Sequence, residues 1–408
     1  MSSSGSSTPT VSQLQVEPFR GGSKWLTIGG GLGAVLVLIS AAVAIGTGSQ
    51  EAYYSYLTAF AYWAGIGFAS VLLLMIFHAT HARWMTILRR PVEAMAAAMV
   101  VFIVLVIPIL VGMKQLYSWV DPVAAGFGKE ALAKIAHKAA YLNVKFFVVR
   151  SFLFIVFAAL VAWRLYGLSQ RQDKEGGTDL LVRQRRFSAG MIPFVAIAIT
   201  FAGFDWLMSL NPTWYSTIFG VYYFAGSFLS ALSILAIVTW HAGRANLFSG
   251  GMNIEHTHSI GKLMLAFTCF WTYIAFSQLL LIWIAGLPEE IPFYITRFKP
   301  GWAGIGVMLI VCNFFVPFGL LLSRARKRDP KRLARVAFFI LLVHYIDIYW
   351  LVMPTLYPEG ATFHWTQPIA FAGVSLVAIA AGVWKLRGRL PVPVRDPYLP
   401  ESLRYRQP

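Results

Sequence analysis

The sequence predicts an all-α integral membrane protein with about ten transmembrane helices. Composition is the first observation: of 408 residues, 58% are hydrophobic and only 12% are charged, and the mean hydropathy is +0.64. A water-soluble chain of this balance would have too little polar surface to cover itself. The second observation is that the apolar stretches are long and continuous, whereas the strands of a membrane barrel alternate over about ten residues. Helices are therefore predicted rather than strands.

Each apolar stretch is long enough to cross a bilayer, which takes about 20 helical residues. In chain order, the predicted helices cover residues 25–46, 56–78, 91–114, 143–167, 189–210, 217–241, 261–287, 303–323, 334–355 and 367–387.

The basic charge of the chain indicates the orientation of these helices. The formal net charge is +17, and 26 of the 34 Lys and Arg residues fall in the tails and loops on the side of the N-terminus. Only six fall in loops on the other side. Positive charge accumulates on the cytoplasmic side of membrane proteins, so both termini are predicted to be cytoplasmic. This distribution accounts for the basic charge without nucleic acid, and it favours contact with anionic lipid.

An internal repeat is predicted from two local matches. At a shift of 160 residues, Tyr62 and His81 meet Tyr222 and His241. The helices ending near 210 and 355 each carry an acid seven residues before a Pro-Thr pair, at Asp205 and Asp347. The matched helices are four apart and so point the same way across the membrane. The predicted organisation is a disordered tail (1–24), a flanking helix (25–55), a first four-helix bundle (56–210), a second (217–355), a flanking helix (367–387) and a C-terminal tail (388–408).

Polar residues at membrane depth are the candidate functional residues, because a charge near the centre of a bilayer costs roughly 2.5–3.5 kcal/mol on insertion scales. Arg150 and Asp205 fall at similar depth on neighbouring predicted helices, so an ion pair or a water-bridged pair is expected. With the aromatic Trp206 beside them, they form a candidate quinone site. A structural clasp is the alternative interpretation.

His344 and Asp347 are three residues apart and share one face of a helix. Without a fixed countercharge they could pass a proton, or simply form a hydrogen-bonded core pair. Histidines at the inner helix ends, His78, His81 and His241, extend the candidate proton path, as does Gln278. Capping of helix ends is the alternative for these histidines. The histidines are not paired at one depth as a bis-His haem requires, and two isolated cysteines exclude Cys-rich clusters on this chain.

Two motifs resemble a known family. Residues 205–210 read DWLMSL and are followed by WYST at 214–217; residues 260–264 read IGKLM, 271–278 read WTYIAFSQ and 287–290 read LPEE. Over nearly the whole chain, the sequence resembles the NrfD/polysulfide-reductase-like membrane subunits of bacterial alternative complex III, of the ten-helix ActF type.

The resemblance implies a membrane subunit of a quinol:cytochrome c oxidoreductase in the bacterial cytoplasmic membrane. It implies menaquinol oxidation near the outer face, with haem and iron–sulfur clusters on partner subunits and a paralogous NrfD-like subunit beside this one. It leaves open whether this subunit binds quinone, conducts protons or does neither. A stand-alone secondary transporter and a purely structural scaffold are the alternative functions.

Overall fold

The fold class predicted from the sequence is confirmed by the computed structural model, which describes residues 10–406. Ten helices in this part of the chain are long and apolar enough to span a membrane. Its only extended pairing is an isolated bridge between Gly301 and Gly360, so the described chain contains no strand.

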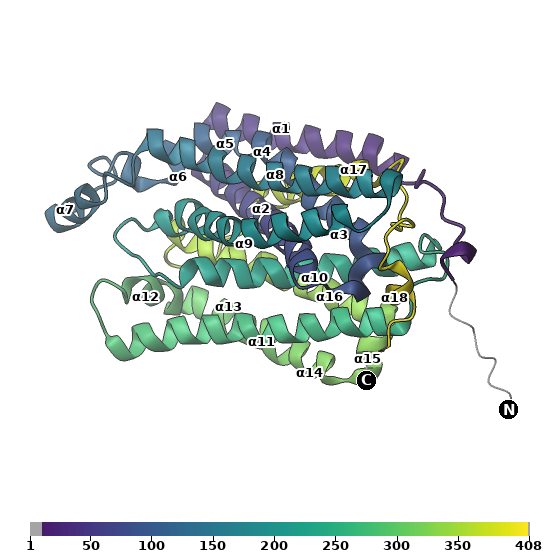
Figure 1. Cartoon of the computed structure of the whole chain (residues 1–408). Coiled ribbons are helices and arrows are strands. Elements are labelled where there is room, and N and C mark those ends of the chain that lie inside the picture. The colour runs from purple at the N-terminus through teal and green to yellow at the C-terminus, as the bar shows by residue number, and fades with distance from the viewer. Residues whose placement is uncertain (1–9, 407–408) are drawn as a thin grey trace.

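Figure 1 shows the spanning helices lying side by side along one axis. In chain order the ten spans are η2–α1 (Trp25–Gly29, Gly30–Thr47), α2 (Gln50–Ala79), η3–α3–η4–α4–α5 (Arg83–Leu88, Arg89–Ala97, Ala98–Val101, Phe102–Leu105, Ile107–Val111), α8 (Val144–Glu175), α9 (Asp179–Trp206) with η6 (Met208–Leu210), α10 (Phe219–Arg244), α11 (Ile254–Ala285), α13–η7–α14 (Pro300–Ile310, Val311–Phe315, Val316–Leu322), α16 (Pro330–Val352) with η8 (Met353–Thr355), and α17 (Thr366–Leu386). The short helices are η1 (Val11–Gln13), α6 (Met113–Leu116), η5 (Ser118–Val120), α7 (Lys129–His137), α12 (Pro292–Phe298), α15 (Arg324–Arg328) and α18 (Leu399–Leu403).

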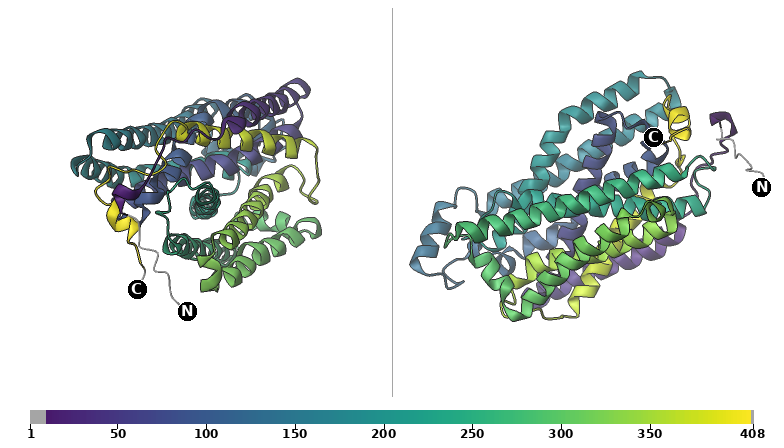
Figure 2. Two further views of the ribbon diagram at one scale, coloured as in Figure 1. Left: turned by 90° about the vertical axis from the view of Figure 1, so that its right-hand side faces the viewer. Right: turned by 90° about the horizontal axis from the view of Figure 1, so that it is seen from below.

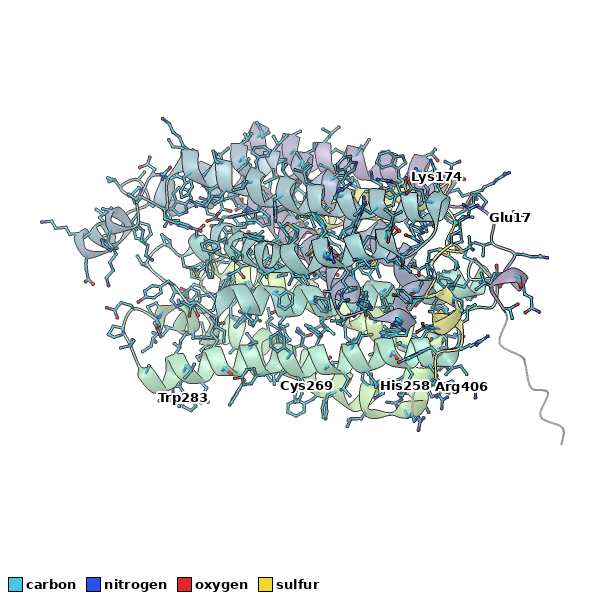
Figure 3. The ribbon with its side chains drawn as sticks, in the orientation of Figure 1. Glu17, Lys174, His258, Cys269, Trp283 and Arg406 are labelled. Atoms are coloured by element: carbon cyan, nitrogen blue, oxygen red, sulfur yellow. The ribbon has the colours of Figure 1, made fainter. Side chains whose placement is uncertain are left out.

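The bundle has two distinct ends. Both tails lie at one end, called the tail end here, and α7 and α12 lie at the other, called the loop end (Figure 1). Along α11, His258 is near the tail end, Cys269 is midway and Trp283 is near the loop end (Figure 3). Successive spans therefore run in opposite directions between these two ends.

α2 and α10 are the most buried spans. Most residues of both helices are buried, as expected for helices enclosed by other helices. α2 packs against α9, α10, α16 and α17, and α10 packs against α11 and α16. Seen from the tail end, α10 lies inside a ring of other helices (Figure 2).

The predicted bundles correspond to groups of helices that touch. α2, α3, α8 and α9 pack together, as do α10, α11, α14 and α16, and α1 pairs with α17 at the edge. The groups are not separate units, because α2 contacts both α10 and α16. Whether they are repeats of one ancestral bundle stays a prediction.

Five spans extend six or more residues beyond a predicted end, and α2 and α8 are two of them. α2 begins at Gln50, where the Ser49 side chain accepts a hydrogen bond from the Ala52 amide at 3.2 Å, the usual role of an N-cap serine. α8 continues to Glu175, and an ion pair between Arg171 and Glu175 supports its last turn. These ends are polar, so an apolar window does not detect them.

The span from Arg83 to Val111, third in chain order, is divided into short helical pieces. It alternates short 3-10 and α-helical pieces between Arg83 and Val111, and Pro108 lies in its last piece. Proline has no amide hydrogen to continue the helical ladder, and 3-10 segments inside a span are often strained or hinge-like.

The N-terminal tail was predicted to lack structure up to residue 24, and it has defined contacts from residue 10. The amide of Phe19 donates to Arg389 O, and the amide of Gly388 donates to Phe19 O, both at 2.8 Å. The hydroxyl of Ser249 donates to Gln15 O at 2.6 Å. The two tails therefore pack on each other at the tail end.

Candidate functional site

The predicted pairing of Arg150 with Asp205 is confirmed. Arg150 on α8 donates from Nε and Nη2 to the two carboxylate oxygens of Asp205 on α9, each at 2.8 Å. A third donor, Nη1, reaches Tyr141 O at 2.9 Å. The guanidinium carbon lies 3.8 Å from the ring centroid of Tyr141 and 4.2 Å from that of Phe146. This bidentate, stacked geometry is the strongest that an arginine and a carboxylate adopt.

Trp206 belongs to the same bonded unit. Its indole nitrogen donates to the Ser151 hydroxyl at 3.1 Å, and its carbonyl accepts from the Tyr117 hydroxyl at 3.2 Å. The side chains of Asp205 and Trp206 are fully buried. The three predicted quinone-site residues therefore form a satisfied clasp between α8 and α9, with no face of the carboxylate open to a ligand.

The predicted pair of His344 and Asp347 on α16 is less tightly bonded. His344 Nδ1 lies 3.4 Å from Asp347 Oδ2. The carboxylate accepts hydrogen bonds from the Tyr222 hydroxyl on α10 and from the Trp271 indole nitrogen on α11, the latter at 3.3 Å. Three helices thus converge on one buried acid that has no ion-pair partner among Lys and Arg of the described chain.

His344 is buried, and neither ring nitrogen makes a hydrogen bond within the described residues. Its ring lies against Gly226, where a methyl group would come within 2.6 Å of the imidazole. Toward the tail end, Ser227 and Ser230 on α10 are also buried with unpartnered hydroxyls. Buried polar groups are normally bonded to protein or to ordered water, so each of these groups is available to a water molecule.

Arg297 is a buried cation that the sequence did not single out. It lies just before α13 and donates to Trp350 O at 3.2 Å, Leu351 O at 2.8 Å and Phe293 O at 2.9 Å. It thereby caps the C-terminal end of α16, one turn beyond Asp347 on the loop side. Burial lowers the pKa of Arg297 to about 9, so it stays charged at neutral pH. Arg297 belongs to α12, a helix in a segment predicted as a loop, and such a position carries no sequence signal for burial.

Two other predicted path residues do not reach Asp347 by hydrogen bonds. Gln278 is buried on α11, two turns from Trp271 toward the loop end, and its amide nitrogen is unpartnered. His241 is exposed at the tail end of α10, with its ring against Trp240. Each lies near one end of the second helical group, and neither contacts the other.

His78 and His81 are brought together at the tail end. They line one small cavity of about 70 Å³ with Arg89, and the Nε2 atom of each imidazole is unpartnered. Burial lowers the pKa of His81, and the neighbouring Arg185 and Arg83 lower it further. A histidine among guanidinium groups is a poor proton acceptor, so this setting does not favour the predicted proton entry.

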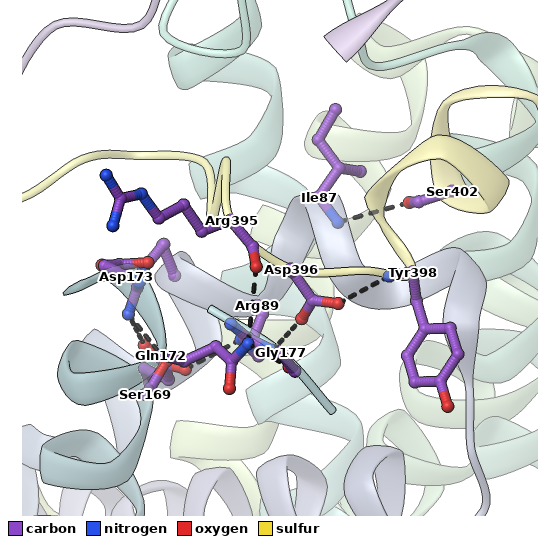
Figure 4. Close-up of polar contacts among 12 residues, drawn as sticks. Ile87, Arg89, Ser169, Gln172, Asp173, Gly177, Arg395, Asp396, Tyr398 and Ser402 are labelled. Atoms are coloured by element: carbon purple, nitrogen blue, oxygen red, sulfur yellow. Dashed lines mark hydrogen bonds and ion pairs between the residues drawn. The ribbon is translucent and has the colours of Figure 1, made fainter. Parts of the chain in front are cut away.

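A buried ionic cluster at the tail end was missed by the sequence analysis (Figure 4). Glu93 on α3 lies 3.1 Å from Arg89 Nε and 2.6 Å from Arg90 Nη1. Arg90 also pairs with Asp173 on α8, and Arg89 pairs with Asp396 of the C-terminal tail. In the sequence, these arginines contribute to the bias of positive charge that predicts the topology. The position of Glu93 inside an apolar stretch was the one sequence feature that indicated a buried ionic cluster here.

The described residues contain no group of three or more His, Cys, Asp or Glu side chains placed to hold a metal ion. No family model matches the chain, and no curated protein matches it.

Proposed function

We propose that the chain is a membrane subunit of a quinol:cytochrome c oxidoreductase complex and that its own contribution is proton transfer through the second helical group. Haem and iron–sulfur clusters would belong to partner subunits, and a paralogous NrfD-like subunit would be a further partner. The motif resemblance is the basis for the complex. The Asp347 cluster is the observation that supports the proton-transfer role.

Asp347 has the chemistry that a proton relay needs. Its carboxylate is hydrogen-bonded to a phenol and an indole but to no guanidinium or ammonium group. His344 next to it has both ring nitrogens available. A carboxyl and an imidazole that lie side by side without a fixed countercharge can each hold the proton, so the proton can pass between them.

The route runs from Asp347 toward the tail end. His344 lies one turn away on α16, and the unpartnered hydroxyls of Ser227 and Ser230 continue along α10. His241 at the exposed end of α10 is the proposed entry from the cytoplasm, since the bias of positive charge assigns the tail end to that side. Arg297 repels cations at the opposite end, and Gln278 lies there as a neutral polar step.

A quinone site beside Arg150 is the second part of the proposal. The clasp itself is fully bonded, so a menaquinone would lie against it and not between its partners. Phe146 and Val149 are exposed apolar residues on the adjacent face of α8. An exposed apolar surface next to the clasp suits a quinone ring.

The test is a pair of substitutions, Asp347→Asn and Asp205→Asn, in the intact complex, with quinol oxidation and proton release measured together. Asp347→Asn is expected to lower the number of protons released per electron, because an amide cannot carry the proton. Trp283→Phe, an exposed apolar change on α11, is the control. Wild-type values for both aspartate variants would reduce these residues to structural roles. Purification of the chain without haem- or cluster-bearing partners would favour a transporter.

A further inference from the structure

The cavity at the tail end has the features of an anion site. It lies between the last turns of α2, the start of η3, the first turn of α9 and the C-terminal tail. Its charged lining residues are Arg83, Arg89, Arg185 and Asp396, and His78 and His81 complete the polar wall. Its volume of about 70 Å³ is enough for a small tetrahedral anion or for water.

Arg89 is the buried anchor of this site. It is 7% exposed, and its Nη1 donates to Asp396 while Nε lies beside Glu93. Its Nη2 atom is buried without a hydrogen bond. A guanidinium normally uses all of its donors when buried, because an unpaired charged donor is costly. Nη2 is therefore available to an acceptor from outside the described chain.

The two histidines add donors to the same cavity. The Nε2 atoms of His78 and His81 are buried and unpartnered. His81 has a φ of +53°, a left-handed conformation that is uncommon for residues with a side chain. Backbone strain of this kind persists where the surroundings hold it, and it is concentrated at binding sites.

The charges around the cavity are unevenly compensated. Asp396 is held by Arg89 and by the Tyr398 amide, and Glu401 pairs with Arg83 at 2.7 Å. Arg185 is exposed at the rim and forms no ion pair within the described residues. The Arg185 guanidinium is therefore left without a countercharge in the lining of the cavity.

We propose that this cavity binds the phosphate group of an anionic phospholipid in the membrane leaflet at the tail end. Arginine donors on two sides and imidazole N–H groups suit a phosphate, which offers several acceptor oxygens. His78 is the second-last residue of a membrane span, so the cavity lies at headgroup depth. Val182, Leu181 and Phe77 provide an apolar rim, and Val182 is 41% exposed. That rim suits a glycerol and acyl chain better than a freely soluble phosphate.

The site does not depend on the proposed respiratory function, because it uses none of the relay residues. Its test is lipid retention by the full chain, purified with its natural partners in mild detergent. Native mass spectrometry would follow titration with phosphatidylglycerol, with phosphatidylcholine as the zwitterionic comparison and inorganic phosphate as the soluble one. One phosphatidylglycerol per chain should remain bound to the wild-type protein.

Arg185→Gln should weaken that retention about tenfold, the effect of losing one charge-assisted hydrogen bond. Arg186→Gln, the same change on the next residue of α9 and outside the cavity lining, should leave retention within about twofold. His81→Asn should also weaken retention, and asparagine keeps the left-handed backbone accessible. Arg185 and Arg186 are both exposed, so neither change should disturb folding.

Three results would overturn the proposal. One is wild-type protein that retains no phosphatidylglycerol beyond phosphatidylcholine. Another is equal loss in Arg185→Gln and Arg186→Gln, which would indicate general surface charge. The third is equal lipid retention in wild type and Arg185→Gln, with inorganic phosphate raising the melting temperature of the wild type alone. That result would assign the cavity to a soluble phosphate compound.

Discussion

At the scale of single residues, the two buried acids differ in how they are compensated. Asp205 shares two 2.8 Å hydrogen bonds with Arg150, whereas Asp347 is bonded only to neutral donors. The first arrangement fixes a charge pair in place. The second leaves a buried carboxyl without a fixed countercharge. The same residue type at matching points of two helical groups thus supports a structural role in one and a chemical role in the other.

Replacing Asp205 alone should lower the stability of the protein more than replacing Asp205 and Arg150 together. Asp205→Leu leaves Arg150 buried without its countercharge, and such losses cost about 3–5 kcal/mol. The double variant Arg150→Met with Asp205→Leu should recover part of this loss, because apolar replacements of buried ion pairs are often neutral. Thermal unfolding of the four proteins of this cycle in one detergent measures it. A double variant no more stable than Asp205→Leu would contradict the clasp.

Gly226 is the residue that gives His344 its position. A methyl group there would lie 2.6 Å from His344 Cε1 and 2.8 Å from Nδ1, so Gly226→Ala must displace the imidazole. The expected destabilisation is about 1–3 kcal/mol, typical of overpacking, with a loss of proton release if His344 is in the relay. Gly243→Ala, on the same helix with open space around it, is the matched control. Equal melting temperatures for both variants would show that the site accommodates the methyl group.

At the scale of elements, α1 depends on α17 for its place in the molecule. α1 is among the least buried spans, and its contact with α17 passes through glycines. A methyl group on Gly373 would lie 2.9 Å from Val37 N, and one on Gly33 would lie 2.8 Å from Leu376 Cβ. Close approach through small residues is a common way for helices to associate in membranes, where no hydrophobic effect drives them together.

Gly373→Val should therefore separate α1 from the bundle. Because the nearest atoms include backbone, rotation of a side chain cannot relieve the clash. We expect destabilisation of about 1–3 kcal/mol and faster proteolysis between α1 and α2. Gly31→Val, on α1 with no atom within 4 Å of the added methyl group, should behave as wild type. Limited proteolysis in detergent compares the two, and identical cleavage rates would argue against a glycine-dependent contact.

The number and order of the spans were predictable from the sequence, because crossing a bilayer demands long apolar stretches. The helix ends that lie beyond the bilayer were not predictable in this way, because they depend on capping and on charged turns such as the end of α8 at Glu175. The approach of Arg150 to Asp205 followed from depth alone on neighbouring helices. The hydrogen-bond donors to Asp347 could not be predicted from depth. Tyr222 and Trp271 reach it only because of how α10 and α11 are rotated about their own axes.

At the scale of the whole molecule, the C-terminal tail closes the tail end of the helical bundle. The C-terminal tail covers the ends of α2, α3 and α8: Asp396 pairs with Arg89, and the amide of Ile87 donates to the Ser402 hydroxyl at 3.3 Å (Figure 4). A basic loop and a distant tail thereby enclose a buried ionic cluster. No local pattern in the sequence indicates this closure, because it joins residues about 300 positions apart.

The orientation of the molecule can be tested with cysteine labelling. The native Cys269 and Cys312 are first replaced by serine, and single cysteines are then placed at Lys129 in α7 and at Arg404 after α18, both of which are exposed. A membrane-impermeant maleimide added to intact cells should label position 129. It should label position 404 only after permeabilisation, because 26 of the 34 basic residues lie on the tail side. Labelling of 404 in intact cells would reverse the orientation, and with it the direction in which Asp347 would receive protons.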